Sequence, residues 1–228
     1  MASTSPVLLV IPVFNEERFI GELLDRVHRI VKPGNILVVN DGSTDNTAAI
    51  LSQLPVNILT HSQNRGKGAA LLSAIRYAQE HRYSWILTMD GDGQHQTGQI
   101  DAFLQAIAND QADIILGNRQ KWGVKMPFHR ILSNGITSII LSLCSGMQRI
   151  HDSQCGFRAM RVTCLDRALF REMGFQFESE MILRLGKQQC RFLEIPVETR
   201  YGSESSSIHL VNDTVKFIKL VIKSFFWN

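Results

Sequence analysis

The sequence lacks the features that mark several large classes of protein. Its 228 residues contain no uninterrupted apolar run of about 18 residues, which is the length that a membrane-spanning helix needs. Residues 1–6 have neither the basic nor the apolar segment of a signal peptide. The four cysteines form no Cys-x-x-Cys pair, which argues against a zinc site. We therefore expect a cytoplasmic chain with reduced thiols.

An excess of charge of one sign is also missing. The net charge is only +3, which is too small to indicate nucleic acid as a partner. The hydrophobic share of 44% and the charged share of 20% are typical of a soluble globular protein. No repeat, linker or low-complexity segment divides the chain. The length favours one large domain over two small ones, and the sequence gives no indication of oligomeric state.

Short apolar runs alternate with helical patterns through the first half of the chain. The runs have the length and composition of buried strands, and the segments between them carry apolar residues at helical spacing. The expected strands are residues 7–13, 36–39, 56–60, 85–89 and 114–116, and the expected helices are residues 16–31, 44–54, 66–80 and 99–109. This alternation predicts an α/β fold, with a mainly parallel sheet flanked by helices.

The pattern changes after Arg119. We expect a loop at residues 122–127, helices at 129–143 and 177–185, and a late strand at 191–196. Residues 202–207 are rich in serine and predict a loop suited to act as a mobile lid.

Polar residues gather where the expected strands end. They are Asn15, Glu16, Asp41, Asp90, Asp92, Asn118 and Arg119. In parallel α/β sheets, ligands bind beyond the carboxyl ends of the strands. The sequence therefore predicts a site at this edge of the sheet.

The segment Thr88-Met89-Asp90-Gly91-Asp92-Gly93-Gln94 is the sharpest of these signals. Side chains two residues apart share a face in an extended chain, so we expect Asp90, Asp92 and Gln94 to converge on one metal ion. Oxygen ligands favour Mg²⁺ or Mn²⁺, which keep positions open for phosphate oxygens. An isolated Asp-x-Asp is more often an acidic turn, but the buried strand before it and the polar strand ends beside it favour a metal site.

Several motifs, in order along the chain, resemble glycosyltransferase family 2. They are Ile11-Pro12-Val13-Phe14-Asn15-Glu16-Glu17, Val39-Asn40-Asp41-Gly42-Ser43-Thr44-Asp45, Asn64-Arg65-Gly66-Lys67-Gly68 and the Asp-x-Asp unit. The resemblance implies the GT-A fold, a Rossmann-like sheet with a nucleotide-sugar site. Residues 152–158 and 201–206 are similar to the branch that transfers mannose or glucose to polyprenyl or dolichyl phosphate. The resemblance covers roughly residues 7–206.

The resemblance implies a nucleotide-binding set. Asp41 is similar to the aspartate that accepts a hydrogen bond from the base, and Lys67 either meets phosphate or is simply solvated. Gly66 permits close backbone approach, although it would serve equally to turn the loop into the following helix. The implied set is Pro12, Phe14, Asn15, Glu16, Asp41, Gly66, Lys67, Asp90 and Gly91.

The resemblance also implies an acceptor side. Arg119, Arg130 and Ser133 are similar to residues that hold the acceptor phosphate, a role that suits the planar fork of arginine. Asp152 is similar to a base or an acceptor-orienting carboxylate, with a loop cap as the alternative. Arg200 resembles a lid residue that helps to neutralise the leaving diphosphate, although the following Ser203-Glu204-Ser205-Ser206 lacks the basic residue of the mannose-synthase pattern. The implied catalytic set is Asp90, Asp92, Arg119, Asp152 and Arg200.

The activity that the resemblance implies is inverting, metal-dependent transfer of a hexose from UDP-glucose or GDP-mannose to a polyprenyl or dolichyl phosphate. The second pKa of a phosphate monoester is about 6, so the ionised acceptor needs no general base. Positioning and neutralisation of the leaving diphosphate then remain for the protein and the metal. Transfer to a saccharide or protein, and a catalytically silent nucleotide-binding module, are the alternatives. Residues 152–158 slightly favour UDP-glucose.

Residues 209–228 predict an amphipathic helix after a catalytic domain of residues 1–208. Lys216, Lys219 and Lys223 share one face at helical spacing. The opposite side carries Val211, Val215, Ile218, Ile222, Phe225 and Phe226. Such a helix suits an anionic membrane surface, and packing on the protein core is the alternative. We therefore expect a peripheral enzyme at the cytoplasmic face of a membrane.

Overall fold

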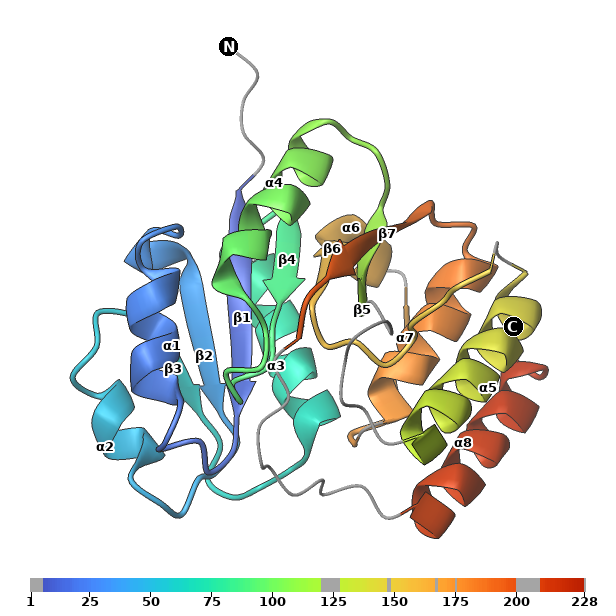
Figure 1. The fold of residues 1–228 in the computed structure, drawn as a ribbon, viewed down its shortest axis with the longest axis horizontal. Helices are drawn as coiled ribbons and strands as arrows, with labels where there is room; N and C mark the ends of the chain where they lie inside the picture. Colours follow the sequence, from blue (N-terminus) through green and yellow to red (C-terminus); the bar gives the residue numbers. More distant parts are fainter. Residues whose placement is uncertain are drawn as a thin grey trace.

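The computed structural model describes residues 6–119, 128–146, 149–166, 168–174, 176–199 and 210–227. Within them, seven strands form one sheet in the order β3-β2-β1-β4-β6-β5-β7 (Figure 1). The strands are β1 (Val7–Val13), β2 (Ile36–Asn40), β3 (Asn57–Thr60), β4 (Trp85–Thr88), β5 (Ile114–Arg119), β6 (Arg158–Arg161) and β7 (Phe192–Val197). Only β6 runs antiparallel to its neighbours in this sheet. The prediction of a mainly parallel sheet is confirmed.

Helices cover both faces of the sheet. Successive residues of a strand point to opposite faces, so Leu8 and Val10 join one core cluster while Leu9 and Ile11 join the other. The first cluster is completed by α3 (Lys67–Glu80), α5 (Phe128–Ser145), α6 (Val162–Leu165), α7 (Gln176–Lys187) and α8 (Leu210–Ser224). The second is completed by α1 (Ile20–Val27), α2 (Thr47–Leu51) and α4 (Ile100–Ala108). Short 3₁₀ helices η1 (Pro33–Asn35) and η2 (Thr97–Gln99) precede β2 and α4.

Helices α1 and α2 are shorter than the sequence predicted. The expected helix at residues 16–31 is helical only over Ile20–Val27, and the one at 44–54 only over Thr47–Leu51. Asn15 has a positive φ of 58°, and the backbone of residues 16–19 forms a turn. Polar contacts between the loops that follow β1 and β2 hold this conformation, which an apolar stripe does not reveal.

Strand β6 was not predicted. It is four residues long and follows the polar segment 152–157. Its first residue, Arg158, pairs with Thr88 at the end of β4 and with Leu116 in β5. Because β6 is antiparallel, this segment enters the sheet at the edge where the parallel strands end, which we call the carboxyl edge.

Helices α5, α7 and α8 pack together at the β5–β7 end of the sheet (Figure 1). Helix α8 buries Leu220 and Ser224, and the ring of Trp227 lies 3.9 Å from the guanidinium of Arg184 on α7. Its exposed large apolar side chains are Val215 and Ile218 in the middle of the helix and Ile222, Phe225 and Phe226 towards its end. The helix therefore packs on the protein with one face and exposes another. No helix in the described ranges is both long and apolar enough to span a membrane.

Candidate active site

The turn after β4 carries Asp90 and Asp92 at the carboxyl edge. Strand β4 ends at Thr88, and residues 91–93 turn, with a φ of 72° at Gly93. The segment is not extended, so the alternation rule does not apply to it, and the convergence of Asp90, Asp92 and Gln94 on one ion stays a prediction. Instead, Oδ1 of Asp92 accepts a hydrogen bond from the backbone N–H of Gln94 at 3.0 Å.

The carboxylate of Asp90 lies against the backbone of Gly156. A Cβ atom at position 156 would lie 2.2 Å from Oδ2 and 2.5 Å from Oδ1 of Asp90, distances that no real Cβ adopts. The hydroxyl of Thr88 donates to the carbonyl oxygen of Gly156 at 2.8 Å. These contacts join the Asp-x-Asp turn and the 152–158 segment into one site.

The ammonium of Lys67 lies between two carboxylates. Its Nζ is 2.6 Å from Oδ1 of Asp90 and 3.2 Å from Oε1 of Glu178. Burial alone would lower the pKa of Lys67, but the two carboxylates outweigh burial and raise it above the usual value. Burial alone would raise the pKa of Asp90, but Lys67 and His95 hold it well below the usual range. Lys67 and Asp90 are therefore both ionised at neutral pH.

Arg158 balances the second carboxylate. Its NH2 lies 3.5 Å from Oε1 of Glu178. Its Nε donates to the carbonyl oxygen of Cys155 at 2.6 Å, and its NH2 donates to that of Ser153 at 2.8 Å. Arg158 and Glu178 are both buried, so this part of the network is fixed in place.

His95 adds a further contact to Asp90. Its Nε2 lies 3.6 Å from Oδ2 of Asp90, and its ring packs against Phe157 with centroids 5.3 Å apart. Its Nδ1 is buried and has no hydrogen-bond partner within the described ranges. The backbone of His95 pairs with that of Thr199, so the chain that leaves β7 passes beside this turn.

Asp41, at the end of β2, is buried and organises the loop before α3. Its Oδ2 accepts from the N–H of Gly66 at 2.7 Å, and its Oδ1 accepts from that of Arg65 at 3.0 Å. Nδ1 of His61 lies 2.6 Å from Oδ1, and Nε2 of the same ring lies 2.9 Å from Oγ of Ser73. A nucleotide base bound to Asp41 would share these oxygens with the loop.

Arg119 and Asp152 form a two-bonded ion pair. Nε of Arg119 donates to Oδ2 of Asp152 at 2.7 Å, and NH2 donates to Oδ1 at 2.9 Å. Burial alone would raise the pKa of Asp152, but the hydrogen bonds and charge of Arg119 outweigh burial and hold it below its usual value. Such a carboxylate is a weak base, which favours an orienting role. Glu194 on β7 holds the same loop by accepting from the backbone N–H groups of His151 and Asp152 at 2.9 and 3.2 Å.

Comparison with known families identifies the chain. Residues 8–169 match the family described as glycosyl transferase family 2. The chain belongs to this family. It is therefore a glycosyltransferase, as the motifs predicted.

Relatives and solved structures agree with this assignment. The chain is 29% identical to the UDP-N-acetylglucosamine--dolichyl-phosphate N-acetylglucosaminyltransferase of Methanococcus voltae, over 87% of each protein. It is also 29% identical to the undecaprenyl-phosphate mannosyltransferase of Micrococcus luteus, over 92% of this chain and 90% of that protein. Glucosyl-3-phosphoglycerate synthase from Mycobacterium tuberculosis, solved with Mn²⁺, UDP and phosphoglyceric acid, has a TM-score of 0.79 at 14% identity, over 96% of this chain and 78% of that one. The predicted GT-A fold is confirmed.

The donor atoms of the family 2 chain fit a divalent cation. Asp90, Asp92 and Gln94 offer only oxygen ligands, and Mg²⁺ typically binds through one or two carboxylates together with substrate phosphates. No group of three or more histidine, cysteine, aspartate or glutamate side chains forms a closed metal site among the described residues.

The loop that follows β1 is held by hydrogen bonds to the loop that follows β2. Oδ1 of Asn15 accepts from the N–H of Thr44 at 2.8 Å, and the N–H of Glu16 donates to Oγ1 of Thr47 at 2.9 Å. Asn15 and Glu16 thus shape the loop. Pro12 lies within β1. The side chain of Phe14 is 41% exposed at this edge.

The glycines that open α3 approach the backbone of residues 172–174. A Cβ atom at Gly66 would lie 2.7 Å from the carbonyl oxygen of Met173, and one at Gly68 would lie 2.7 Å from the carbonyl carbon of the same residue. Gly66 also has a φ of 94°. In this structure, the absence of a side chain at these glycines lets their backbone approach the backbone of residues 172–174. Gly91 lies against Val13 at the end of β1.

The structure describes the last three predicted residues to different extents. Ser133 is half-buried on α5. Arg130 lies in the same helix, but its side chain is outside the described residues, as are Arg200 and the loops predicted at 122–127 and 202–207. Helix α5 is nevertheless tied to the Asp152 loop, since Oγ of Ser138 donates to Oγ of Ser153 at 2.9 Å.

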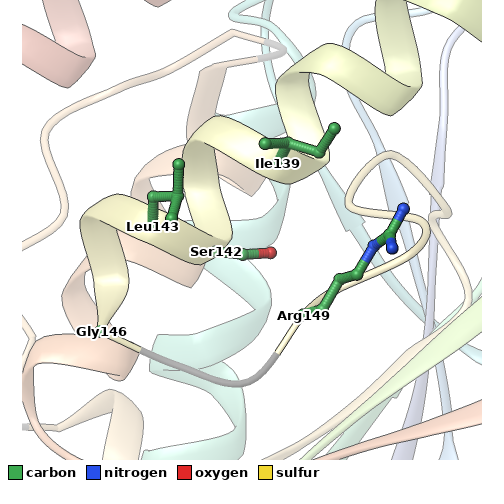
Figure 2. A pocket seen from close by; sticks show the side chains of 5 residues that line it. All are labelled: Ile139, Ser142, Leu143, Gly146 and Arg149. Atoms are coloured by element: carbon green, nitrogen blue, oxygen red, sulfur yellow. The ribbon is translucent and has the colours of Figure 1, made fainter.

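An open hollow of about 580 Å³ lies beside the C-terminal half of α5 (Figure 2). It is lined by Ile139, Ser142, Leu143, Gly146 and Arg149. Ile139 and Leu143 are exposed, and Oγ of Ser142 accepts from the backbone N–H of Ile150 at 2.8 Å. The hollow is thus mainly apolar, with a guanidinium on the segment that leads to Asp152.

Sequence reasoning missed three members of the charged network. They are His95, Arg158 and Glu178. Glu178 lies in the first turn of α7, where a lone acidic residue is also a common way to stabilise a helix start. His95 directly follows the predicted metal ligands, and a histidine at that position was a usable signal.

Proposed function

We propose that this glycosyltransferase moves a hexose from a UDP or GDP sugar to a polyprenyl or dolichyl phosphate at a membrane surface. One structural observation carries the proposal. The short segment 152–156 holds Arg119 at one end, through Asp152, and packs against Asp90 at the other, through Gly156. A single segment thus joins the turn that would bind the metal and the donor diphosphate to Arg119, an arginine suited to bind the phosphate of the acceptor.

The donor would bind with its diphosphate at the Asp-x-Asp turn. Asp90, Asp92 and Gln94 would hold Mg²⁺ or Mn²⁺, which when bound neutralises charge on the leaving diphosphate. Lys67 adds a positive charge beside Asp90. Asp41 and the loop that it organises would face the base, and Phe14 would contact the nucleotide. UDP-glucose is the first donor to test.

The acceptor chemistry explains why the site needs no strong base. A phosphate monoester is largely ionised at neutral pH, so its oxygen would attack the anomeric carbon directly. The bond from that carbon to the nucleoside diphosphate would break as the new bond forms, the diphosphate would leave, and the configuration would invert. Asp152 would orient Arg119 rather than remove a proton. Arg130 and Ser133 on α5, with Arg200, would complete the charge around the two phosphates.

The membrane surface would be contacted by α8 and α5. Helix α8 exposes Lys216, Lys219 and Lys223 as well as apolar side chains, a combination that suits anionic lipid. Helix α5 packs against α8 and exposes Ile136, Ile139 and Leu143. The hollow beside α5 offers apolar wall for part of a polyprenyl chain, and Trp227 keeps α8 anchored to α7.

A partition assay tests this function. Purified protein receives a labelled donor, either UDP-glucose, UDP-N-acetylglucosamine or GDP-mannose, with Mn²⁺ and polyprenyl phosphate in detergent. We expect metal-dependent label in the organic phase with at least one donor. Label found only on a water-soluble glycan or on protein would show that the acceptor is not a lipid phosphate. Absence of turnover with every donor would support a catalytically silent nucleotide-binding module.

A further inference from the structure

A neutral four-residue network occupies the core of the candidate site. It runs from Asp90 through Lys67 to Glu178 and on to Arg158. Two positive groups alternate with two negative ones, and only Asp90 belongs to the proposed metal ligands. Lys67 Nζ lies 2.6 Å from Oδ1 of Asp90, so the ammonium occupies one of the two carboxylate oxygens that Asp90 offers to a cation.

A divalent cation that coordinates Oδ1 of Asp90 competes with this ammonium. The cation and the ammonium cannot both contact that oxygen, because their like charges repel strongly in a partly buried site. Binding of a cation at Oδ1 therefore displaces Lys67 from Asp90. A half-buried ammonium without a carboxylate partner is unfavourable, so the cost of metal binding depends on what else Lys67 can contact.

Glu178 is already in contact with Lys67, at 3.2 Å. It is 6% exposed and lies in the first turn of α7. Arg158 cannot take the place of Lys67, because the carbonyl oxygens of Cys155 and Ser153 fix its guanidinium. Lys67 thus needs only to shift its contact from one carboxylate to the other.

We infer that Glu178 is a positioning residue, which retains Lys67 beside the site when a divalent cation takes the Asp90 carboxylate. Glu178 itself touches neither metal nor substrate. It lowers the free-energy cost of displacing Lys67 from Asp90, and it keeps the Lys67 ammonium close to where the donor diphosphate would bind. This inference rests on the metal site of the proposed function, but not on the identity of the acceptor.

A double-mutant cycle on Mn²⁺ binding tests the inference, with free Mn²⁺ measured by electron paramagnetic resonance on the full chain. Lys67→Gln removes the competitor and should tighten Mn²⁺ binding by about 3-fold to 10-fold. Glu178→Gln removes the alternative carboxylate partner of Lys67, so Lys67 stays paired with Asp90. This variant should weaken Mn²⁺ binding by a similar factor. In the Lys67→Gln background, the effect of Glu178→Gln should shrink by at least threefold.

Two outcomes of the same cycle would contradict the inference. An equal effect of Glu178→Gln in both backgrounds means that Glu178 acts only as a charge, and no tightening in Lys67→Gln means that Lys67 does not compete. Either result overturns the inference. The Lys67→Gln arm needs no Glu178 variant, so it can overturn the inference even if Glu178→Gln is unstable in thermal unfolding. Glu80→Gln, an equal change of charge at the exposed far end of α3, should leave Mn²⁺ binding within about twofold.

The experiment separates this inference from the proposed function. Mn²⁺ binding is measured without lipid or sugar donor, and again with UDP. A wild-type chain that binds no Mn²⁺ in either condition contradicts the metal site and this inference together. A chain that shows the predicted coupling but labels only a soluble acceptor supports the role of Glu178 and overturns the lipid acceptor.

Discussion

The guanidinium of Arg119 and the carboxylate of Asp152 join two segments that lie 33 residues apart in the sequence. Oδ2 of Asp152 also accepts from the backbone N–H of Arg119 at 3.1 Å. The pair therefore fixes both the end of β5 and the loop that enters β6. An arginine held in this way keeps its planar guanidinium in one orientation, as directed recognition of a phosphate requires.

Asp152→Asn should weaken this part of the site. Hydrogen bonds to charged groups contribute about 1.5–3 kcal/mol each, net, and the variant keeps a neutral acceptor, so we expect a loss of roughly that size in urea unfolding at pH 7. The KM for polyprenyl phosphate should rise more than kcat falls. Asp25→Asn, an exposed change on α1, is the control and should alter stability by less than about 0.5 kcal/mol.

The Asp152 contribution should depend on pH in a defined direction. The folded-state pKa of Asp152 lies below the ordinary value of 3.8, so the unfolded chain takes up protons first as the solution is acidified. The stability difference between wild type and Asp152→Asn should be full above the ordinary carboxyl pKa and should shrink as pH falls through the lowered one. A difference that stays constant from pH 7 to pH 3 would contradict the ion pair.

Gly156→Ala should displace the Asp90 carboxylate. The added methyl group would lie 2.2 Å from Oδ2, and overpacking of this kind costs about 1–3 kcal/mol. We expect Mn²⁺-dependent turnover to fall by about 100-fold or more, because small misplacements of reacting groups have effects of that size. Gly34→Ala, where an added Cβ meets nothing within 4 Å, is the control. Equal turnover in the two variants would disprove the contact.

Asp41→Asn should separate two roles of one residue. The amide can replace only one of the oxygens that accept from Arg65 and Gly66, so stability should fall by about 1–3 kcal/mol. Calorimetric titration with UDP and GDP should show binding about 10-fold weaker for the preferred nucleotide. Ser73→Ala, which removes only the hydroxyl next to His61, should have the smaller effect. Unchanged nucleotide affinity would limit Asp41 to holding the loop.

Charge reversal on α8 should release the chain from anionic membranes. Each lysine near such a surface contributes about 1 kcal/mol, so changing Lys216, Lys219 and Lys223 to Glu should abolish sedimentation with phosphatidylserine vesicles at moderate salt. Turnover of detergent-solubilised lipid should persist. The matched control changes three exposed basic residues elsewhere to Glu, namely Arg29, Lys32 and Arg76. Equal loss of vesicle binding in both variants would indicate an effect of net charge alone.

The fold was predictable from the sequence where hydrophobic periodicity decides it. Strand β1 has the predicted bounds, and α7 differs from its predicted range by only a few residues. Strand β6 was hidden because only four residues pair and the first of them is a buried arginine. Its polar lead-in resembles a loop, and no local pattern indicates that a strand reverses between two parallel neighbours.

The sequence allowed us to predict that the candidate site lies where the strands end, but not which charged side chains pair with one another. The pairing of Arg119 with Asp152 depends on the insertion of β6, and that of Lys67 with Glu178 on the packing of α3 against α7. Both are long-range contacts that spacing alone does not encode. The resemblance pointed to Lys67 and Asp152, while the pairing of each with its charge partner required the structure.

Lipid-phosphate transfer is tested most directly by the mass of the product. Wild-type protein is incubated with Mn²⁺, the preferred nucleotide sugar and either polyprenyl phosphate or the matching polyprenol, and the organic extract is analysed by mass spectrometry. We predict polyprenyl phosphate carrying one added sugar, and no sugar on the polyprenol. Sugar found only on polyprenol or on water-soluble acceptors would contradict a lipid-phosphate glycosyltransferase.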